Sequence, residues 1–273
     1  MNIHPIKIFV INLKSSIERR KIMERQLNKL NLPFEIFDAI NGASLTENEI
    51  LSLYDSDYYN SRPTYYSSGM VGCTLTHYYI YKKIVEDNIQ NAFILEDDMA
   101  LNSDLPKVLN RLSEVIKKDE AIMLFYQSYS PIKLSIDSEV PLTDKYKLYQ
   151  VSDLDGLIST AAYFIPYEVA QSMLNKMLPI SNVPDDWKKF YDRNMLNGVR
   201  VVYPFLLQNT YQKTTINPTA KGGILFQKIL YFAEDYRIFP IYHLLKRRRK
   251  KNTAKTRRCF VVNEPIKHLR ITG

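Results

Sequence analysis

Three consecutive carboxylates, Glu96-Asp97-Asp98, directly follow the apolar run 92–95. Adjacent anions repel one another and lose hydration when buried, so the triplet needs a cation or several hydrogen-bond donors beside it. Carboxylate oxygens are the ligands that Mg²⁺ and Mn²⁺ prefer. The triplet therefore predicts a divalent metal site, and the alternative is a solvated acidic turn at the end of a strand.

The run before the triplet indicates where these carboxylates lie. Four apolar residues in succession fit a strand buried on both faces of a parallel sheet. The triplet then falls at the carboxyl end of the strand, where open α/β sheets bind their ligands. Because side chains alternate along a strand, Glu96 and Asp98 face one way, whereas Asp97 faces the other. The first two can share one metal or divide a metal and a ribose between them.

Polar residues also follow the first strand-like segment, 6–13. Asn12 stands at its exit, and Arg19 and Arg20 lie on the helix that we predict after it. A guanidinium can pair with a phosphate or stack on a base, so the two arginines indicate the mouth of a nucleotide site. The alternative is a solvated helix face.

Cys73 and His77 are four residues apart on a predicted helix, 69–87, so their side chains face the same way. A metal pair is conceivable, but no further ligand lies nearby in the sequence. We therefore favour a packed thiol and a hydrogen-bonded core histidine.

The elements that carry these residues alternate between strands and helices. A strand–helix–strand opening is typical of a parallel α/β sheet, and 45% apolar residues over 273 positions are enough for one large α/β domain. A capping box opens a helix after Ser44 or Thr46. We expect a flexible, Pro-interrupted loop over 130–144. The predicted strands are 6–13, 34–37, 92–98, 121–125, 160–165 and 199–204, and the predicted helices are 16–30, 45–60, 69–87, 103–117 and 167–177.

Composition narrows the class of protein. No apolar run approaches the ~18 residues of a transmembrane helix, and no secretory segment precedes the first strand. Two cysteines without a CxxC motif form neither a disulfide framework nor a zinc ribbon. We therefore expect a cytoplasmic protein.

The net charge of +8 is concentrated near the C-terminus, in the basic segment 246–258. Such a cluster binds polyanions, which include nucleic acid, anionic lipid and phosphorylated glycolipid. The preceding segment, 225–245, is apolar and aromatic, as a membrane-surface anchor requires. A C-terminal helix packed on the domain is the alternative. We expect a boundary between a domain over 1–218 and a helical, basic extension over 219–273.

Four segments, taken together, resemble glycosyltransferase family 25: residues 8–13 with Arg19-Arg20, then 34–42, 69–77 and 93–98. The resemblance covers roughly residues 6–215. Bacterial members of the family build the outer core of lipooligosaccharide and lipopolysaccharide, typically as galactosyltransferases. Thr76 stands where the family usually has serine and Asn41 where it often has aspartate, and both keep similar hydrogen-bonding groups.

The resemblance implies a nucleotide-sugar-binding, Rossmann-like α/β domain of the GT-A type. It implies a mixed, mainly parallel sheet with flanking helices, a UDP-hexose donor, Mn²⁺ or Mg²⁺ at the triplet, and inversion at the anomeric carbon. We take Asp98 and then Glu96 as the metal ligands. The predicted donor-binding residues are Asn12, Arg19, Arg20, His77, Glu96 and Asp97.

A second acidic motif of the family, Pro-x-Asp, matches Pro184 to Asp186. An inverting transferase needs a carboxylate to take the proton of the acceptor hydroxyl. Asp186 is the first candidate for this base and Asp185 the second. The alternative is a pair of helix N-cap aspartates before Trp187, and a cap can also line a site.

The predicted function is metal-dependent, inverting transfer of a hexose, most simply galactose from UDP-galactose, to a lipooligosaccharide or lipopolysaccharide core sugar. The predicted place is the inner face of a bacterial inner membrane. The alternatives are a polyanion-binding protein with a structural acidic turn, and another metal-dependent nucleotide enzyme. The sequence contains no P-loop, HExxH or nucleic-acid-binding motif, so we predict no specific nucleic-acid partner.

Overall fold

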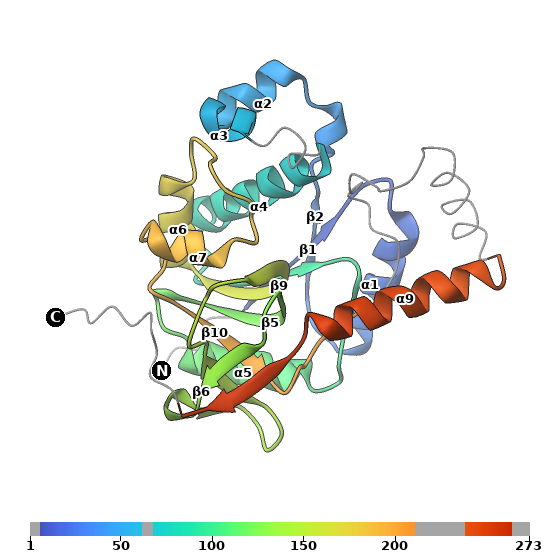
Figure 1. The fold of residues 1–273 in the computed structure, drawn as a ribbon, viewed down its shortest axis with the longest axis vertical. Helices are drawn as coiled ribbons and strands as arrows, with labels where there is room; N and C mark the ends of the chain where they lie inside the picture. Colours follow the sequence, from blue (N-terminus) through green and yellow to red (C-terminus); the bar gives the residue numbers. More distant parts are fainter. Residues whose placement is uncertain (1–5, 62–67, 211–237, 264–273) are drawn as a thin grey trace.

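The computed structural model describes residues 6–61, 68–210 and 238–263. Its centre is an eight-stranded sheet in the order β2-β1-β3-β9-β5-β10-β8-β7 (Figure 1). The strands are β1 (Lys7–Asn12), β2 (Glu35–Asp38), β3 (Asn91–Glu96), β5 (Glu120–Ser128), β7 (Val140–Pro141), β8 (Lys147–Gln150), β9 (Leu157–Pro166) and β10 (Gly198–Tyr203). Because β9 is antiparallel to β3 and β5, and β8 to β10 and β7, the other six strands run in one direction. The predicted mixed, mainly parallel α/β sheet is confirmed.

Helices cover both faces of the sheet. On one face α1 (Ile17–Lys29) and α5 (Leu105–Val115) bury Met23, Leu27 and Leu109 against the strands. On the other face α4 (Ser68–Glu86), α6 (Tyr167–Lys176) and α7 (Trp187–Asp192) bury Ile80 and Trp187 in a second cluster. Strands β1 and β3 supply nearly unbroken apolar runs because both of their faces are covered.

The strand order creates a switch point between β1 and β3. The chain leaves β1 through α1 to reach β2 on one side, and it returns through α4 to reach β3 on the other side of β1. In register, Ile11 lies opposite Glu96, so Asn12 and Asp97 emerge together at the carboxyl edge. A crevice opens at such a switch point because the two crossovers diverge.

A short layer of helices covers the N-terminal end of α4. It contains the 3-10 helix η1 (Gly42–Ser44), α2 (Glu47–Leu53) and α3 (Ser56–Ser61). The capping box that we predict is present, between Thr46 and Glu49. Gly42 touches the α4 backbone so closely that a Cβ atom on it would lie 1.7 Å from the carbonyl oxygen of Ser68. Glycine at this position lets η1 and α4 meet.

The flexible loop predicted over 130–144 is wrong. The segment contains β6 (Ile132–Ser135), η2 (Ile136–Ser138) and β7. Strand β6 pairs in parallel with β12 (Cys259–Val262), a partner more than a hundred residues away that no local pattern indicates. A third small pairing joins β4 (Met99–Ala100) to β11 (Gln208–Asn209).

The C-terminal segment is described from Ile238 to Asn263. It forms α9 (Ile241–Lys255), drawn in red in Figure 1, and then β12. The predicted boundary at 218/219 and most of the apolar stretch 225–245 lie outside the described residues. Within the described ranges, no helix combines the length and hydropathy that a membrane span requires.

Candidate active site

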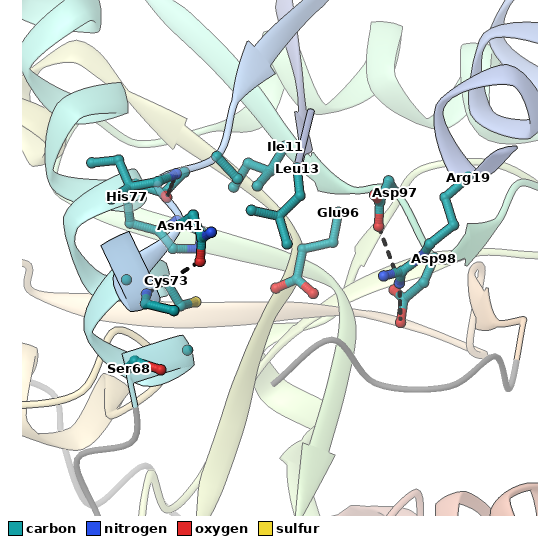
Figure 2. Close-up of a pocket in the computed structure, with 16 residues that line it drawn as sticks. Ile11, Leu13, Arg19, Asn41, Ser68, Cys73, His77, Glu96, Asp97 and Asp98 are labelled. Carbon is teal, nitrogen blue, oxygen red and sulfur yellow. Dashed lines mark hydrogen bonds and ion pairs between the residues drawn. The ribbon is translucent and has the colours of Figure 1, made fainter. Parts of the chain in front are cut away.

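A cavity of about 350 Å³ opens at the carboxyl edge of β1 and β3. Its walls come from the end of β1, from α1, from the segment before η1, from the first turns of α4 and from the acidic triplet. Figure 2 shows Glu96 in the middle, with Arg19, Asp97 and Asp98 to one side and Cys73 and Asn41 to the other. The switch-point crevice is thus a real hollow with acidic and basic walls.

Asp97 is held at this edge by two donors. Asn12, only 2% exposed, donates from Nδ2 to Asp97 Oδ2 at 2.6 Å, and Arg19 Nη2 lies 3.0 Å from Asp97 Oδ1. Burial raises the pKa of Asp97, and the Arg19 and Asn12 contacts oppose that rise. Both oxygens of Asp97 are therefore occupied by protein donors.

Asp98 is held by three residues, but one of its oxygens has no hydrogen-bond partner among the described residues. Its Oδ2 accepts from Asn209 Nδ2 at 3.0 Å and lies 3.2 Å from Arg19 Nη2. Its carbonyl oxygen accepts from the backbone and hydroxyl of Thr210. The buried Oδ1 has no hydrogen-bond partner among the described residues. Burial raises the pKa of Asp98.

Glu96 is the least compensated of the three carboxylates. It accepts one hydrogen bond, from the hydroxyl of Thr160 at 3.2 Å. Burial, and then the charges of Asp98 and Asp97, raise the pKa of Glu96 to about 8. A cation that enters the cavity would strongly stabilise the ionised form of this carboxyl group.

These residues fit a divalent cation in part. The buried Asp98 Oδ1 and the poorly compensated Glu96 carboxylate are hard oxygen ligands of the kind that Mg²⁺ and Mn²⁺ prefer, and both residues line the cavity. Within the described ranges no group of three or more His, Cys, Asp or Glu side chains is arranged to hold a metal. A metal here would need further ligands from substrate oxygens or water, as Mg²⁺ sites beside phosphates usually do.

His77 and Cys73 form the wall opposite the arginine. His77 is fully buried, and its Nδ1 lies 2.8 Å from the Tyr163 hydroxyl, which itself contacts Tyr81. The hydrogen-bonded core histidine that we favour is thus present, and burial lowers its pKa to about 3. Its Nε2 has no partner in the part of the chain that is described. His77 is a neutral donor or acceptor at the cavity.

Arg20 is not brought to the cavity. Its side chain is exposed on the outer face of α1 and pairs with Glu24 at 2.8 Å, as the solvated-face alternative describes. Its neighbour Arg19 is only 15% exposed and carries the contacts to Asp97 and Asp98. The two arginines are adjacent in sequence, but Arg19 faces the cavity and Arg20 faces solvent.

The two aspartates of the second acidic motif have different surroundings. Asp186 is the N-cap of α7, and its Oδ1 accepts from the Lys189 backbone at 3.1 Å. Asp185 makes no such cap, and burial raises its pKa. Burial raises the pKa of Cys73, and the charges of Glu96 and Asp185 raise it further. Neither Asp185 nor Asp186 is among the residues that line the cavity.

Sequence reasoning missed the residues that hold the triplet from a distance. Thr160 reaches Glu96 because β9 is irregular here: its pairing with β5 shifts register, and Ser159 has a φ of 111°. Asn209 and Thr210 reach Asp98 through the two-residue pairing of β11 with β4. A hydroxyl and an amide far along the chain carry no local signal of these contacts.

Thr76 stands where the family usually has serine, and its hydroxyl joins two segments of the cavity wall. It accepts from the Ile40 backbone at 2.9 Å and donates to the Gly72 carbonyl at 2.6 Å. The hydroxyl thereby ties the segment before η1 to α4. Serine carries the same hydroxyl, so the exchange preserves both bonds.

An open α/β sheet, covered on both faces and hollowed at its switch point by a charged cavity, defines a ligand-binding protein of the doubly wound class. The family model described as glycosyltransferase family 25 (LPS biosynthesis protein) matches residues 5–187, more than half of the chain. The chain belongs to this family, and it is a glycosyltransferase.

Two kinds of relative differ in how much of their length the chain spans. The lipooligosaccharide biosynthesis protein lic2B of Haemophilus influenzae is 23% identical over 96% of this chain and 92% of its own length. Procollagen galactosyltransferase 1-B of Xenopus laevis is 29% identical over 64% of this chain, and procollagen galactosyltransferase 2 of Homo sapiens is 28% identical over 64%. The chain spans 30% and 29% of the length of these two procollagen galactosyltransferases.

A solved structure is also similar, that of a glycosyltransferase involved in the glycosylation of the major capsid of PBCV-1. It is 14% identical and covers 76% of this chain and 82% of its own, with a TM-score of 0.31.

Proposed function

We propose that this enzyme transfers galactose from UDP-galactose to a core sugar of lipooligosaccharide or lipopolysaccharide, with inversion and with a divalent metal. The observation that carries the proposal is the Arg19-bound acidic triplet at the switch point of a family 25 chain. A relative that matches nearly the whole chain is named for lipooligosaccharide biosynthesis, and relatives that match 64% of the chain are named for galactosyl transfer.

The donor diphosphate would lie at the Arg19 end of the cavity. Arg19 is buried against two carboxylates, and its Nε has no hydrogen-bond partner among the described residues, so one donor remains for a phosphate oxygen. Asp98 Oδ1 and Glu96 would hold Mn²⁺ or Mg²⁺ at the same end. When bound, the metal supplies positive charge that offsets the charge of the departing diphosphate.

The reaction exchanges one bond at the anomeric carbon of the hexose. The acceptor hydroxyl oxygen forms a bond to this carbon from the face opposite to the phosphate, and the bond to the diphosphate oxygen breaks with its electron pair. Asp185 takes the hydroxyl proton, because its raised pKa suits a base and its carboxylate is not used as a helix cap. Asp186, the first candidate by sequence, instead fixes the start of α7.

The experiment is a thermal-shift screen of UDP-, GDP- and CMP-sugars with Mn²⁺, followed by turnover of the best donor with purified lipooligosaccharide. A ligand that binds only the folded state raises the midpoint of unfolding, and ~100-fold saturation adds about 2.7 kcal/mol. We expect UDP-galactose to give the largest shift. A response to GDP- or CMP-sugars alone would overturn the donor assignment.

Adjacent arginines provide a matched pair of variants for this screen. Arg19→Ala removes the inner guanidinium, and we expect it to abolish the UDP-galactose shift. Arg20→Ala removes the same group from the outer face, where it pairs with Glu24, and should leave the shift intact. Equal effects of the two substitutions would contradict the proposed diphosphate site.

A further inference from the structure

The C-terminal helix α9 carries most of the excess charge of the molecule but little of its core. Residues 241–258 contain nine Lys and Arg side chains and no acidic one, so the other residues hold 28 basic against 29 acidic groups. None of the residues in α9 is buried. The two predictions for 225–245, a membrane-surface anchor or a helix packed on the domain, concern residues that lie mostly outside the described ranges.

The two sides of α9 are nevertheless different. Ile241, Leu245 and Arg249, spaced four apart, are half-buried and face the domain. Arg247 and Lys251, four residues apart, lie on the opposite side, Arg248 and Lys255 lie along the edge between the two sides, and all four are exposed. We call these four residues the basic stripe. From residue 247 to residue 255 the stripe covers a length of about 12 Å along the helix.

Apolar side chains are exposed at the N-terminal end of the same helix. Phe239, just before α9, is 78% exposed, Leu244 on the outward side is 60% exposed, and Ile238 is 38% exposed. The transfer of such exposed apolar side chains from water into hydrocarbon is favourable. Phe239 and Leu244 suit the acyl-chain region of a bilayer surface. The neighbouring basic side chains suit its anionic headgroups.

We infer that the outward side of α9 binds the surface of an anionic phospholipid membrane, with the basic stripe on the headgroups and Phe239 inserted below them. Phosphate backbones of nucleic acid would also attract the stripe, but they offer nothing to the exposed Phe239 and Leu244. The inference concerns a surface outside the cavity, and it holds or fails independently of the donor and the acceptor.

The rest of the C-terminal segment fixes α9 on the domain. Directly after the helix, Thr256 accepts from the Ser128 backbone, and β12 pairs with β6. Arg257 stacks on Phe205, with its guanidinium carbon 4.0 Å from the ring centroid. A membrane that binds the stripe is therefore coupled to the folded domain and not to a loose tail.

The experiment is co-sedimentation of the full-length protein with vesicles of phosphatidylcholine alone and with added phosphatidylglycerol. We expect binding to the anionic vesicles at low salt and little binding to the neutral ones. The variant Arg247→Glu/Arg248→Glu/Lys251→Glu should lower the affinity for anionic vesicles at least tenfold. Lys82→Glu/Lys107→Glu/Lys118→Glu makes the same change of net charge on exposed lysines elsewhere and should bind like the wild type.

Two further measurements separate the sources of affinity. Phe239→Ser should weaken the binding that persists at high salt, because that residue acts through burial and not through charge. Duplex DNA at equal phosphate concentration should bind more weakly than the vesicles. The inference is overturned by absent binding to anionic vesicles, by equal losses in the two triple variants, or by tighter binding to DNA. Unchanged UDP-galactose shifts in every variant would show that the cavity is intact.

Discussion

The backbones of Gly42 and Gly72 are in direct contact. A Cβ atom built on Gly72 would lie 2.7 Å from the Gly42 nitrogen and 2.4 Å from the Ile40 carbonyl oxygen, closer than side chains approach backbone. This contact sets the separation between the segment 39–43 and the first turns of α4, both of which line the cavity. The geometry of the cavity thus depends on two positions without side chains.

Gly72→Ala should therefore damage both stability and the site. Overpacking against backbone that cannot move aside costs about 1–3 kcal/mol, and here the displaced backbone is a cavity wall. Urea unfolding measures the first effect and the UDP-galactose shift measures the second. Gly198→Ala is the matched control, because its new methyl would meet only flexible side chains at 3.4 Å or more. Equal destabilisation in both variants would contradict the role of the contact.

Asp98 Oδ1 is the oxygen that we expect to respond to a metal. Asp98→Asn replaces one carboxylate oxygen by a donor group, so it should abolish the rise in unfolding midpoint that Mn²⁺ gives to the wild type. Asp38→Asn, at the exposed end of β2, should keep the rise. The measurement is thermal unfolding with Mn²⁺ and after chelation with EDTA. A retained Mn²⁺ effect in Asp98→Asn would refute the assignment of this ligand.

How much of this site the sequence predicts depends on how far apart the contributing residues are. Glu96, Asp97 and Asn12 are predicted correctly at one edge, because an apolar run and the exit of a strand are local patterns. The partners that hold them, such as Thr160 and Asn209, come from an irregular strand and a two-residue pairing. Those contacts are consequences of tertiary packing, and no window of sequence contains them.

The difference between local patterns and tertiary packing also explains the outcome for the two arginines and for the strand pairings. Periodicity places Arg19 and Arg20 on one helix but does not say which faces the triplet, since that depends on how α1 packs. The strands that cross over through helices are predicted well. The pairing of β6 with β12 joins segments over a hundred residues apart, and the sequence pattern of 130–144 is polar and Pro-interrupted.

Glu96 should make the metal-free protein less stable as the pH rises. Its folded-state pKa lies above its unfolded value, so the folded state binds the extra proton between pH 4.5 and about 8 and loses that advantage across this window. Glu96→Gln, which cannot ionise, should match the wild type near pH 4.5 and exceed it at pH 8 by on the order of 4 kcal/mol. Urea unfolding at several pH values with EDTA measures the difference.

Glu139 is the control for this pH effect, because its pKa is shifted in the opposite direction. Hydrogen bonds from Lys147 and Tyr149 lower the pKa of Glu139, so its charged form is favoured in the folded state. Glu139→Gln should therefore not stabilise the protein at pH 8. A parallel pH profile for the wild type and Glu96→Gln would show that the Glu96 carboxyl is not the responsible group.

Arg257 should stabilise the attachment of the C-terminal segment. Its guanidinium lies between Phe125 and Phe205, 4.7 Å and 4.0 Å from the ring centroids, and Nη2 donates to the Leu207 carbonyl at 2.9 Å. Arg257→Ala should cost about 1–3 kcal/mol of unfolding free energy, from cation–π contacts and one charged hydrogen bond. The neighbouring Arg258 is exposed, and Arg258→Ala should change stability by less than about 0.5 kcal/mol. Similar losses in both variants would mean that the stacking is not what holds β12.

Asp185 and Asp186 should have separable roles in catalysis and folding. Asp185→Asn keeps shape but removes the proposed base, so kcat should fall by roughly 10²–10⁴-fold with little change in KM for UDP-galactose. Asp186→Ser replaces one good N-cap residue by another and should preserve both stability and turnover, whereas Asp186→Ala should lose about 1 kcal/mol of stability with kcat nearly unchanged. Steady-state kinetics with a fixed acceptor and urea unfolding distinguish the two roles. If Asp186→Ser lost turnover and Asp185→Asn kept it, the cap residue itself would be the base, and the lone pair now accepting from Lys189 would have to be released for the proton.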